Sequence, residues 1–366
     1  MSVNIRMKKV AAIILSLLIT IGLTSSCEDP TSSDISELFE DPNFEALIRE
    51  ALDIPSGEIT AEDMLSITLL FGPARELTNI SGIELCDSLV ILNLAFNSIF
   101  DITPLSGLTS LKALDLRGNS IKNITLLAGL ANLEVISMPN NMISDLTPLS
   151  SLTNLTYLEF TDNNINDLAP LSGLTNLNHL ILQGNDINNI GPLSGLESVF
   201  NLVLSENQIS DISHLAGLSN LSSLGLDKNQ ISDISPLAGL ANMRWLWLSE
   251  NHISNIAPLS GLTKLIWLRI YSNQISDISS LSGLTNLTIL DLDTNLISDI
   301  VPLAGLNDLR ALELEFNQIV DIKPLVDNTG FGEEDYVYLN NNPLSDTSIT
   351  VYIPQLRAKG VDVRWE

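Results

Sequence analysis

Asparagine recurs along this chain at a strict period of 22, and each copy is followed two positions later by isoleucine. The copies stand at positions 97, 119, 141, 163, 185, 207, 229, 251, 273, 295 and 317. A unit this short cannot enclose a hydrophobic core, so each unit must bury its apolar side against the units before and after it. The period therefore predicts a solenoid of stacked repeats.

One unit, residues 221–242, shows how each repeat is expected to fold; it reads LSSLGLDKNQISDISPLAGLAN. Leu224 and Leu226 alternate with small or polar residues, which predicts a short strand with both leucines pointing inward. The amide of Asn229 can donate and accept hydrogen bonds, so stacked asparagines can satisfy backbone groups that would otherwise be buried without partners. The apolar residues that follow are spaced by three, which favours a 3₁₀ turn over an α-helix: Ile231, Ile234, Leu237 and Leu240.

The pattern L-x-x-L-x-L-x-x-N-x-I-x-x-I-x-x-L-x-x-L is that of the leucine-rich repeat, and the form NQISDISPLAGL resembles the 22-residue bacterial class of the internalins. It is also similar, less closely, to the intracellular phosphatase regulators of the same superfamily. The resemblance covers residues 41–366. It implies an α/β solenoid, a leucine-rich repeat horseshoe with a parallel β-sheet on the concave side, 3₁₀ turns on the convex side and helical caps at both ends.

Residues 1–26 resemble a bacterial lipoprotein signal peptide. Three basic residues precede an apolar run at 10–23, which is too short for a bilayer span but suits a signal peptide. The small residues directly before Cys27 resemble a lipobox, in which cleavage leaves that cysteine as the lipidated N-terminus. This implies an exported protein anchored by lipid at the bacterial cell envelope or surface; cleavage nearby by ordinary signal peptidase is the alternative.

After the signal peptide, we expect a tether at 27–40, a helical N-terminal cap at 41–66, leucine-rich repeats at 67–344 with eleven regular copies at 89–330, and a C-terminal cap at 345–366. Asp41 followed by Pro42 predicts the start of a helix, and Thr60 with Asp63 predicts a second one.

The C-terminal cap is expected to contain a helix from Ser345 to Gly360 and then a closing strand. Trp365 continues the alternation of that strand, which predicts that it lies in the core. Cys86 occupies the position of Leu108 in the next repeat, so we expect a buried and unreactive thiol.

The charge of the chain excludes several classes of partner. Residues 1–26 contain three basic and no acidic side chains, so the remainder carries 14 Lys and Arg against 44 Asp and Glu, a net charge of −30. Such a chain does not suit nucleic acid or adsorption to anionic lipid, so contact with a membrane is expected only through the lipid anchor.

No constellation in the sequence indicates an enzyme or a cofactor. The histidines at 179, 214 and 252 occupy unrelated repeat positions, and none is in register with a Ser or Cys nucleophile. There is no glycine-rich phosphate loop and no metal-binding spacing of His and Cys. We therefore expect a protein without catalytic residues, cofactor or specific metal.

Acidic residues form a column at one repeat position, which raises the question of calcium. Asparagine replaces aspartate in part of the column, and turn capping accepts either residue, whereas a calcium site depends on carboxylates. We therefore interpret the column as structural. Its members are Asp101, Asn123, Asp145, Asp167, Asn189, Asp211, Asp233, Asn255, Asp277, Asp299 and Asp321.

The outward positions of the strands remain free for binding, and aromatic residues gather there within two adjacent repeats. Trp, Tyr and Arg are enriched at binding hot spots, and large exposed apolar patches usually have a partner. The alternative is that these contacts only stabilise the sheet. The candidate partner-binding residues are the aromatic group Trp245, Trp247, Trp267, Arg269 and Tyr271, the apolar neighbours Ile181 and Val203, and the acidic flank Asp291, Asp293, Glu313 and Glu315.

An aromatic centre with an acidic flank favours a protein partner that has an apolar and a basic contact surface. Internalins of this repeat class use the concave face to bind host surface proteins, so the resemblance implies a monomeric, non-enzymatic recognition protein. Two alternatives remain open. The aromatic rings could stack on carbohydrate, which would make the protein a sugar or cell-wall binder. If the N-terminal signal is spurious, the chain could be an intracellular phosphatase regulator.

Overall fold

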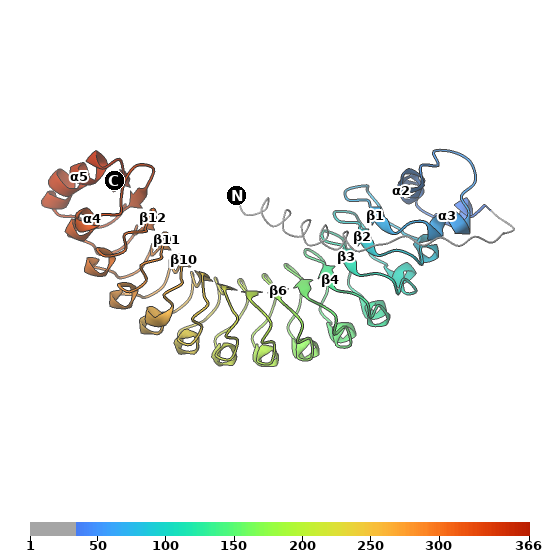
Figure 1. The fold of residues 1–366 in the computed structure, drawn as a ribbon, viewed down its shortest axis with the longest axis horizontal. Coiled ribbons are helices and arrows are strands. Elements are labelled where there is room, and N and C mark those ends of the chain that lie inside the picture. Colours follow the sequence, from blue (N-terminus) through green and yellow to red (C-terminus); the bar gives the residue numbers. More distant parts are fainter. Residues whose placement is uncertain (1–33) are drawn as a thin grey trace. The chain divides into compact units, whose positions relative to one another are not determined.

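The computed structural model describes residues 34–366, so the expected signal peptide and Cys27 lie outside the described residues. The chain divides into two compact units, one that ends at Ile143 and one that spans Ser144–Glu366. In both units a short strand alternates with a 3₁₀ turn (Figure 1). The repeat solenoid with 3₁₀ turns that the sequence predicts is therefore confirmed in each unit.

The first unit begins with the short helices η2 (Ser36–Leu38), α2 (Pro42–Leu52) and α3 (Ala61–Leu65). The carboxylate of Asp41 accepts hydrogen bonds from the first turn of α2, and Pro42 is the first residue of that helix. The same carboxylate accepts a hydrogen bond from the Thr78 N–H at 2.7 Å, which ties the helix to the first repeat. Thr60 and Asp63 form the expected capping box of α3.

The strands of the first unit are parallel and pair in sequence order. They are β1 (Leu69–Phe71), β2 (Ile91–Asn93), β3 (Ala113–Asp115) and β4 (Val135–Ser137). The turns between them are η3 (Ile83–Leu85), η4 (Thr103–Leu105) and η5 (Thr125–Gly129). Cys86 is fully buried beside η3, which confirms a core cysteine, and this burial raises the pKa of its thiol to about 12.

The second unit repeats the same arrangement over a longer stretch of chain, with its strands along the inner side of the ribbon and its turns along the outer side (Figure 1). Its parallel strands are β5 (Tyr157–Glu159), β6 (His179–Ile181), β7 (Asn201–Val203), β8 (Ser223–Gly225), β9 (Trp245–Trp247), β10 (Trp267–Arg269), β11 (Ile289–Asp291), β12 (Ala311–Glu313), β13 (Tyr336–Tyr338) and β14 (Asp362–Arg364). Up to β12, each strand residue pairs with the equivalent residue of the next repeat, at an offset of 22. Side chains at one repeat position therefore stack in columns.

The turns of the second unit are mostly 3₁₀ and lie between successive strands. They are η6 (Thr147–Leu149), η7 (Ala169–Leu171), η8 (Gly191–Leu193), η9 (Ser213–Leu215), η10 (Ser235–Leu237), η11 (Ala257–Gly261), η12 (Ser279–Leu281) and η13 (Val301–Leu303). The last turns are helical: α4 (Lys323–Asp327), the π-helical turn η14 (Ser348–Tyr352) and α5 (Ile353–Ala358). Among residues 34–366, no helix is long and apolar enough to cross a bilayer.

The asparagine ladder satisfies buried backbone groups, as the sequence predicts. The side-chain nitrogen of Asn207 donates to the carbonyls of Leu182 at 3.0 Å, Leu204 at 3.0 Å and Ser205 at 3.2 Å. Its side-chain oxygen accepts from the Ile187 N–H at 3.0 Å. Each asparagine of this kind thus joins its own repeat to the preceding one.

A second asparagine ladder runs on the exposed side of the second unit, and it was not predicted from the sequence. Each member donates from its side chain to a backbone carbonyl of the preceding repeat, for example from Asn286 to Thr263 at 2.7 Å. Asn176, Asn220 and Asn242 make the same contact. Asparagine at this repeat position is therefore a structural feature.

The expectation that Trp365 lies in the core was wrong. The alternation holds for Val361 and Val363, which are buried, but β14 ends at Arg364. Trp365 follows the strand and is only half-buried, with the Arg357 guanidinium 4.3 Å from its ring centroid. Period-two alternation orients a side chain only as far as the strand extends.

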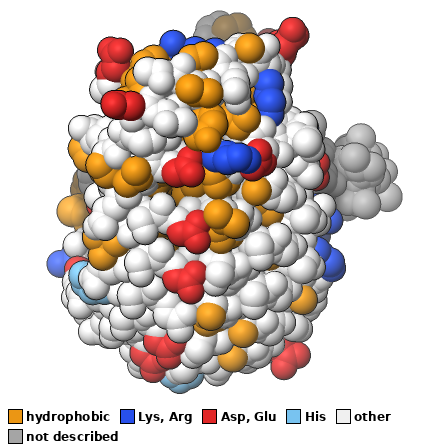
Figure 2. All heavy atoms as spheres, turned by 90° about the vertical axis from the view of Figure 1, so that its left-hand side faces the viewer, with side chains coloured by type: hydrophobic (Ala, Val, Ile, Leu, Met, Phe, Trp, Pro, Cys, Tyr) orange, Lys and Arg blue, Asp and Glu red, His pale blue; other side chains and the backbone are white. Residues whose placement is uncertain are grey.

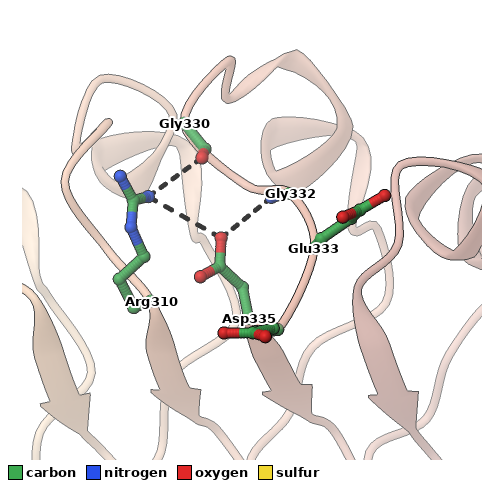
Figure 3. Close-up of a pocket in the computed structure, with 6 residues that line it drawn as sticks. Arg310, Gly330, Gly332, Glu333 and Asp335 are labelled. Atoms are coloured by element: carbon green, nitrogen blue, oxygen red, sulfur yellow. Dashed lines mark hydrogen bonds and ion pairs between the residues drawn. The ribbon is translucent and has the colours of Figure 1, made fainter.

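A pocket of about 500 Å³ lies where the last repeat contains extra residues (Figure 3). Nη1 of Arg310 donates to the Gly330 carbonyl at 2.9 Å and lies 3.7 Å from Oδ2 of Asp335. That oxygen also accepts from the Gly332 N–H at 2.8 Å. A Cβ on Gly330 would lie 1.8 Å from the Asn307 carbonyl oxygen, so the loop packs directly on the preceding repeat. The polar groups that line this pocket hold the loop in place.

Candidate binding surface

The structure places three tryptophans on one side of neighbouring strands in the second unit. Trp245 pairs with Trp267 in the sheet register, and Trp247 pairs with Arg269. The rings of Trp247 and Trp267 meet edge to face, with centroids 5.7 Å apart and an interplanar angle of 75°. Leu246 between the first two tryptophans is fully buried on the other side of the sheet. The leucines therefore form the core, and the tryptophans lie outside it.

Exposure is uneven within this aromatic group. The side chain of Trp245 is 36% exposed, whereas Trp247, Trp267 and Tyr271 are half-buried against their neighbours. The Tyr271 hydroxyl donates to Glu250 at 2.9 Å, and burial together with this bond raises the pKa of Tyr271 to about 12. The group is thus a largely preformed surface with Trp245 most accessible.

Gly225 joins Val203 to the tryptophans. A Cβ added at Gly225 would lie 3.2 Å from Cγ1 of Val203 and 3.7 Å from Cε3 of Trp247, so the bare backbone of β8 leaves room for both side chains. No role was predicted for this glycine from the sequence. Ile181, by contrast, is only 9% exposed, so the expectation that it adds to the exposed apolar surface was wrong.

Arg269 connects the aromatic group to the acidic residues. Its guanidinium lies 5.5 Å from the Tyr271 ring centroid, and its Nε is 3.3 Å from Oδ2 of Asp291. Asp291 is only 4% exposed, so the expectation of a solvent-exposed flank was wrong for this residue. The Asp291 carboxylate is buried and paired with Arg269, so it cannot act as a solvent-exposed charge at the edge of a binding interface.

Three carboxylates come together next to Arg269: oxygens of Asp291, Asp293 and Glu313 all lie within 4.8 Å of one another. Burial, followed by repulsion from Glu313, raises the pKa of Asp291 to about 6. Burial, followed by repulsion from Asp291, raises the pKa of Asp293 to about 7. Asp293 also accepts a hydrogen bond from the N–H of half-buried Glu315 at 2.6 Å. In Figure 2, acidic, basic and apolar side chains lie next to one another on the face of this unit that is turned to the viewer.

Two tyrosines that sequence reasoning missed border the acidic residues on the other side. The Tyr336 hydroxyl donates to Glu313 at 3.0 Å, and its ring lies 4.6 Å from that of Tyr338. Tyr338 pairs with Glu313 in the register and has the Arg364 guanidinium 4.4 Å from its ring centroid. The offset between β12 and β13 is 25 residues instead of 22. A comparison of positions at a fixed spacing of 22 residues therefore does not place these tyrosines on the face.

Asp227 is a further acidic residue that was not singled out from the sequence. Its carboxylate accepts from the Ser249 N–H at 2.8 Å, and burial raises its pKa to about 6. It lies on the side of the aromatic group away from Asp291. The aromatic residues are therefore bordered by carboxylates on two sides.

The aspartate and asparagine column caps turns, as expected. Oδ1 of Asp233 accepts from the Ser235 N–H at 2.8 Å, and Oδ1 of Asn255 accepts from the Ala257 N–H at 3.0 Å. Because Asp and Asn both offer this side-chain oxygen, either residue can occupy the column. Hydrogen bonds from Thr103 hold the pKa of Asp101 below its ordinary value.

We predict that calcium does not bind to this column. In calorimetric titrations with calcium, Asp233→Asn should behave like the wild type, because the Asn side chain keeps the capping oxygen. Asp293→Asn is the comparison variant, since Asp291, Asp293 and Glu313 have carboxylates close enough to share an ion. Tight, stoichiometric binding that Asp233→Asn weakens and Asp293→Asn leaves intact would contradict this assignment.

We also predict that stability rises as the pH falls from about 8 to about 5. The pKa values of Asp291 and Asp293 in the folded protein lie above the ~3.9 of an exposed aspartate, so the folded state binds more protons in this window. Their contribution to stability is present at low pH and is lost as the pH rises through their folded-state pKa values. Urea unfolding should show a smaller pH dependence in Asp293→Asn, with Asp233→Asn as the control. An identical pH dependence in Asp293→Asn and the wild type would refute the assignment.

The comparisons with known proteins agree with the leucine-rich repeat fold. The family "Leucine Rich repeats (2 copies)" matches residues 109–151, 197–239 and 263–305, whereas no curated protein matches the chain. The crystal structure of an internalin (InlF) from Listeria monocytogenes is 36% identical, with 82% of this chain and 96% of that chain covered and a TM-score of 0.74.

Two more distant structures share the fold. The functional domain of InlJ from Listeria monocytogenes is 20% identical, with 91% of this chain and 81% of that chain covered and a TM-score of 0.71. The second is the ectodomain of the plant receptor kinase GASSHO1/SCHENGEN3 from Arabidopsis thaliana, in complex with CASPARIAN STRIP INTEGRITY FACTOR 2. It is 20% identical, with 84% of this chain and 45% of that chain covered and a TM-score of 0.65. The fold and the repeats define a leucine-rich repeat protein. Within that class, the identity to the Listeria internalin places the chain in the internalin family.

Proposed function

We propose that this internalin-like chain is a non-enzymatic recognition protein that binds another protein through the inner sheet face of its second unit. The observation that carries the proposal is the aromatic group on β9 and β10, which lies outside the leucine core and includes a tryptophan that is 36% exposed. Folding of the repeats depends on the buried leucines, so these aromatic residues are available for binding. Aromatic residues and arginine at the centre of a face are typical of binding hot spots.

The chemistry of the face suggests what the partner presents. Val203 and the tryptophans favour an apolar side chain, and the half-buried carboxylates of Asp293 and Glu313 favour a basic one. The net charge of the chain, −27 at pH 7, adds attraction toward a basic partner at low salt. The receptor ectodomain from Arabidopsis thaliana, which shares the fold, is crystallised in complex with CASPARIAN STRIP INTEGRITY FACTOR 2.

Carbohydrate binding is the second candidate, and Trp245 is the residue that favours it, because an exposed ring can stack on a sugar. Trp247 and Trp267 make carbohydrate binding less favourable. Their rings meet edge to face and are half-buried, so few ring faces are accessible for a sugar to stack on. A glycan array decides between the two. Binding to sugars that is lost in Trp245→Ala would favour carbohydrate as the ligand.

The experiment for protein binding uses residues 28–366 as bait against envelope and culture material. The bait is compared with the double variant Trp245→Ala/Trp247→Ala and with Phe316→Ala, which removes a 56% exposed aromatic ring elsewhere in the same unit. We expect one protein that the wild type and Phe316→Ala retain and the double variant loses, and that titrates stoichiometrically once purified. Equal retention by all three baits would place the binding site elsewhere.

We further propose that the protein is exported and that lipid on Cys27 holds it at the cell envelope. The signal-like residues 1–26 and the small residues before Cys27 support this. The phosphatase-regulator alternative requires an intracellular location, which cell fractionation tests directly.

We predict that the mature protein starts at a lipidated Cys27. Intact-mass and peptide mass spectrometry of the membrane fraction should detect a diacylglyceryl-modified N-terminal cysteine, and Cys27→Ser should move the protein to the soluble fraction. Detection of an unmodified Cys27 inside a longer mature chain would contradict the anchor.

A further inference from the structure

Two exposed phenylalanines break the polar pattern on one side of the first unit. Phe96 and Phe100 follow β2 and are 54% and 67% exposed. At the equivalent positions of the next nine repeats the chain has only glycine or polar residues. Apolar residues return at Phe316 and Val320, ten repeats after the two phenylalanines. The exposed pair Phe96 and Phe100 is therefore not part of the repeat consensus.

The backbone at Phe96 is unfavourable for an aromatic side chain. Its φ is +57°, in the left-handed region that favours Gly, Asn and Asp. Gly118 and Asn140, which are equivalent to Phe96 in the next two repeats, suit this conformation. The ring of Phe96 lies against Gly118, where an added Cβ would be 2.7 Å from Cδ1 of the ring. An exposed aromatic ring at a position with a backbone cost points to a contact outside the fold.

The N-terminal part of the chain joins the fold beside these two rings. The Ile35 N–H donates to the Ile59 carbonyl at 2.9 Å, so the chain is held on the cap from its first described residues. The Asp41 carboxylate accepts from the Thr78 N–H at 2.7 Å. Thr78 is equivalent to Phe100 in the preceding repeat, about 5 Å away along the stack. The helices α2 and α3 lie at the same β1 end of this unit (Figure 1).

The stretch of chain between Cys27 and the cap is short. Cys27 and Asp34 are seven positions apart, so even a fully extended chain would span at most ~25 Å between them. A lipid on Cys27 therefore keeps the beginning of the first unit close to the bilayer. Phe96 and Phe100 lie on the side where this stretch joins the fold, so lipid is the surface within their reach.

We propose that Phe96 and Phe100 insert into the bilayer interface next to the lipid anchor, so that the first unit contacts the membrane in a fixed orientation. The proposal rests on the proposed lipid on Cys27 and adds a second point of contact beside it. Aromatic rings are favoured at the boundary between headgroups and acyl chains, and binding there increases with the apolar area that is buried.

The charged residues beside the pair are compatible with this contact. Lys122 is exposed and is equivalent to Phe100 in the next repeat, so its ammonium group can reach headgroup phosphates. Asp101 accepts from the Thr103 N–H at 2.8 Å and from its hydroxyl at 2.6 Å, so this carboxylate is turned toward its own repeat. The net charge of −27 opposes adsorption to anionic lipid, so the contact depends on the two apolar rings.

The first test attaches residues 27–366 through Cys27 to a maleimide phospholipid in phosphatidylcholine vesicles. Cys86 is fully buried, so coupling is confined to Cys27. Phe96→Trp/Phe100→Trp introduces two tryptophans into the first unit, whereas the four native ones, at 245, 247, 267 and 365, belong to the second unit. The added fluorescence is measured relative to the wild type, with and without bromine on the acyl chains.

Brominated lipid should quench about half or more of the fluorescence that Phe96→Trp/Phe100→Trp adds, because the added rings lie at the level of the acyl chains. The matched control is Phe316→Trp/Val320→Trp, which places tryptophans at the equivalent positions of the last regular repeat. The fluorescence added in the control should stay unquenched, since the lipid-bearing end of the chain does not join the fold there.

The second test measures how strongly the pair contributes to binding. A single 14-carbon chain on Cys27 binds vesicles only weakly and reversibly, so a further contact is measurable. Phe96→Asn/Phe100→Ser introduces the residue types that other repeats have at these positions, as in Asn140 and Ser210, so the variant should fold. We expect it to bind phosphatidylcholine vesicles about tenfold or more weakly than the wild type. The control Phe316→Asn/Val320→Ser should bind like the wild type.

The outcomes separate the contact from the anchor. Unquenched fluorescence in Phe96→Trp/Phe100→Trp, or equal vesicle binding by the wild type and Phe96→Asn/Phe100→Ser, would overturn the membrane contact. An equal loss of binding in the control Phe316→Asn/Val320→Ser would also overturn it, because any exposed apolar residue would then act alike. Detection of an unmodified Cys27 in the native protein refutes the proposed anchor alone, since both tests attach the lipid chemically.

Discussion

Trp247→Ala is expected to weaken partner binding by ~2–4 kcal/mol, because truncation of an aromatic residue at the centre of an interface removes a large contact area. The same change should reduce the free energy of unfolding by only ~1 kcal/mol, which is the usual contribution of one aromatic pair. Trp247 contacts Trp267 edge to face but lies outside the leucine core. Affinity and stability should therefore separate in this variant.

The measurement is a titration of the captured partner at low and high salt, together with urea unfolding. Phe316→Ala is the aromatic control, and Glu315→Gln tests a half-buried charge beside the face. The tryptophan variant should be weak at both salt concentrations, whereas the glutamate variant should differ from the wild type mainly at low salt. If Trp247→Ala unfolds much more easily and binds normally, the aromatic group is a packing feature.

Asn207→Ala is expected to lower the free energy of unfolding by ~1–3 kcal/mol, because it leaves buried backbone groups without hydrogen-bond partners. The groups that lose a partner include the Ile187 N–H and the Leu182 carbonyl. Urea unfolding at constant pH measures the change, which needs no knowledge of the binding partner.

Asn220→Ala is the matched control for this prediction. Asn220 makes one hydrogen bond, to the Glu197 carbonyl at 2.8 Å, and it is exposed, so water can replace the lost group. We expect a loss of ~0.5–1 kcal/mol there. Equal effects of the two substitutions would mean that burial of the ladder is not what makes it stabilising.

Strict periodicity is what made the fold predictable from sequence. The recurring asparagine, the inward leucines and the spacing of three each specify one element of the repeat, and the structure contains all of them. The position of the tryptophans followed from the same register, since equivalent residues of successive repeats must be neighbours once the repeats stack. Periodicity thus predicts which side chains stack in a column and on which face of the sheet each column lies.

Burial within the face could not be predicted in this way. How far a side chain is covered depends on the size of its neighbours in adjacent repeats, so Ile181 and Asp291 are buried although their positions point outward. Breaks in the period caused the other errors. The longer final repeat hid Tyr336 and Tyr338, and the end of β14 left Trp365 outside the core.

The constant offset between strands has a consequence for how such a chain can change in length. Because β5 to β12 all pair at the same offset, loss or duplication of one whole repeat joins surfaces of the same shape and restores both asparagine ladders. The longer offset at β13 does not allow this, since the loop around Gly330 packs directly on the Asn307 carbonyl. Length variants should therefore arise upstream of that loop, and each would shift the tryptophans by one repeat along the face while the terminal cap stays the same.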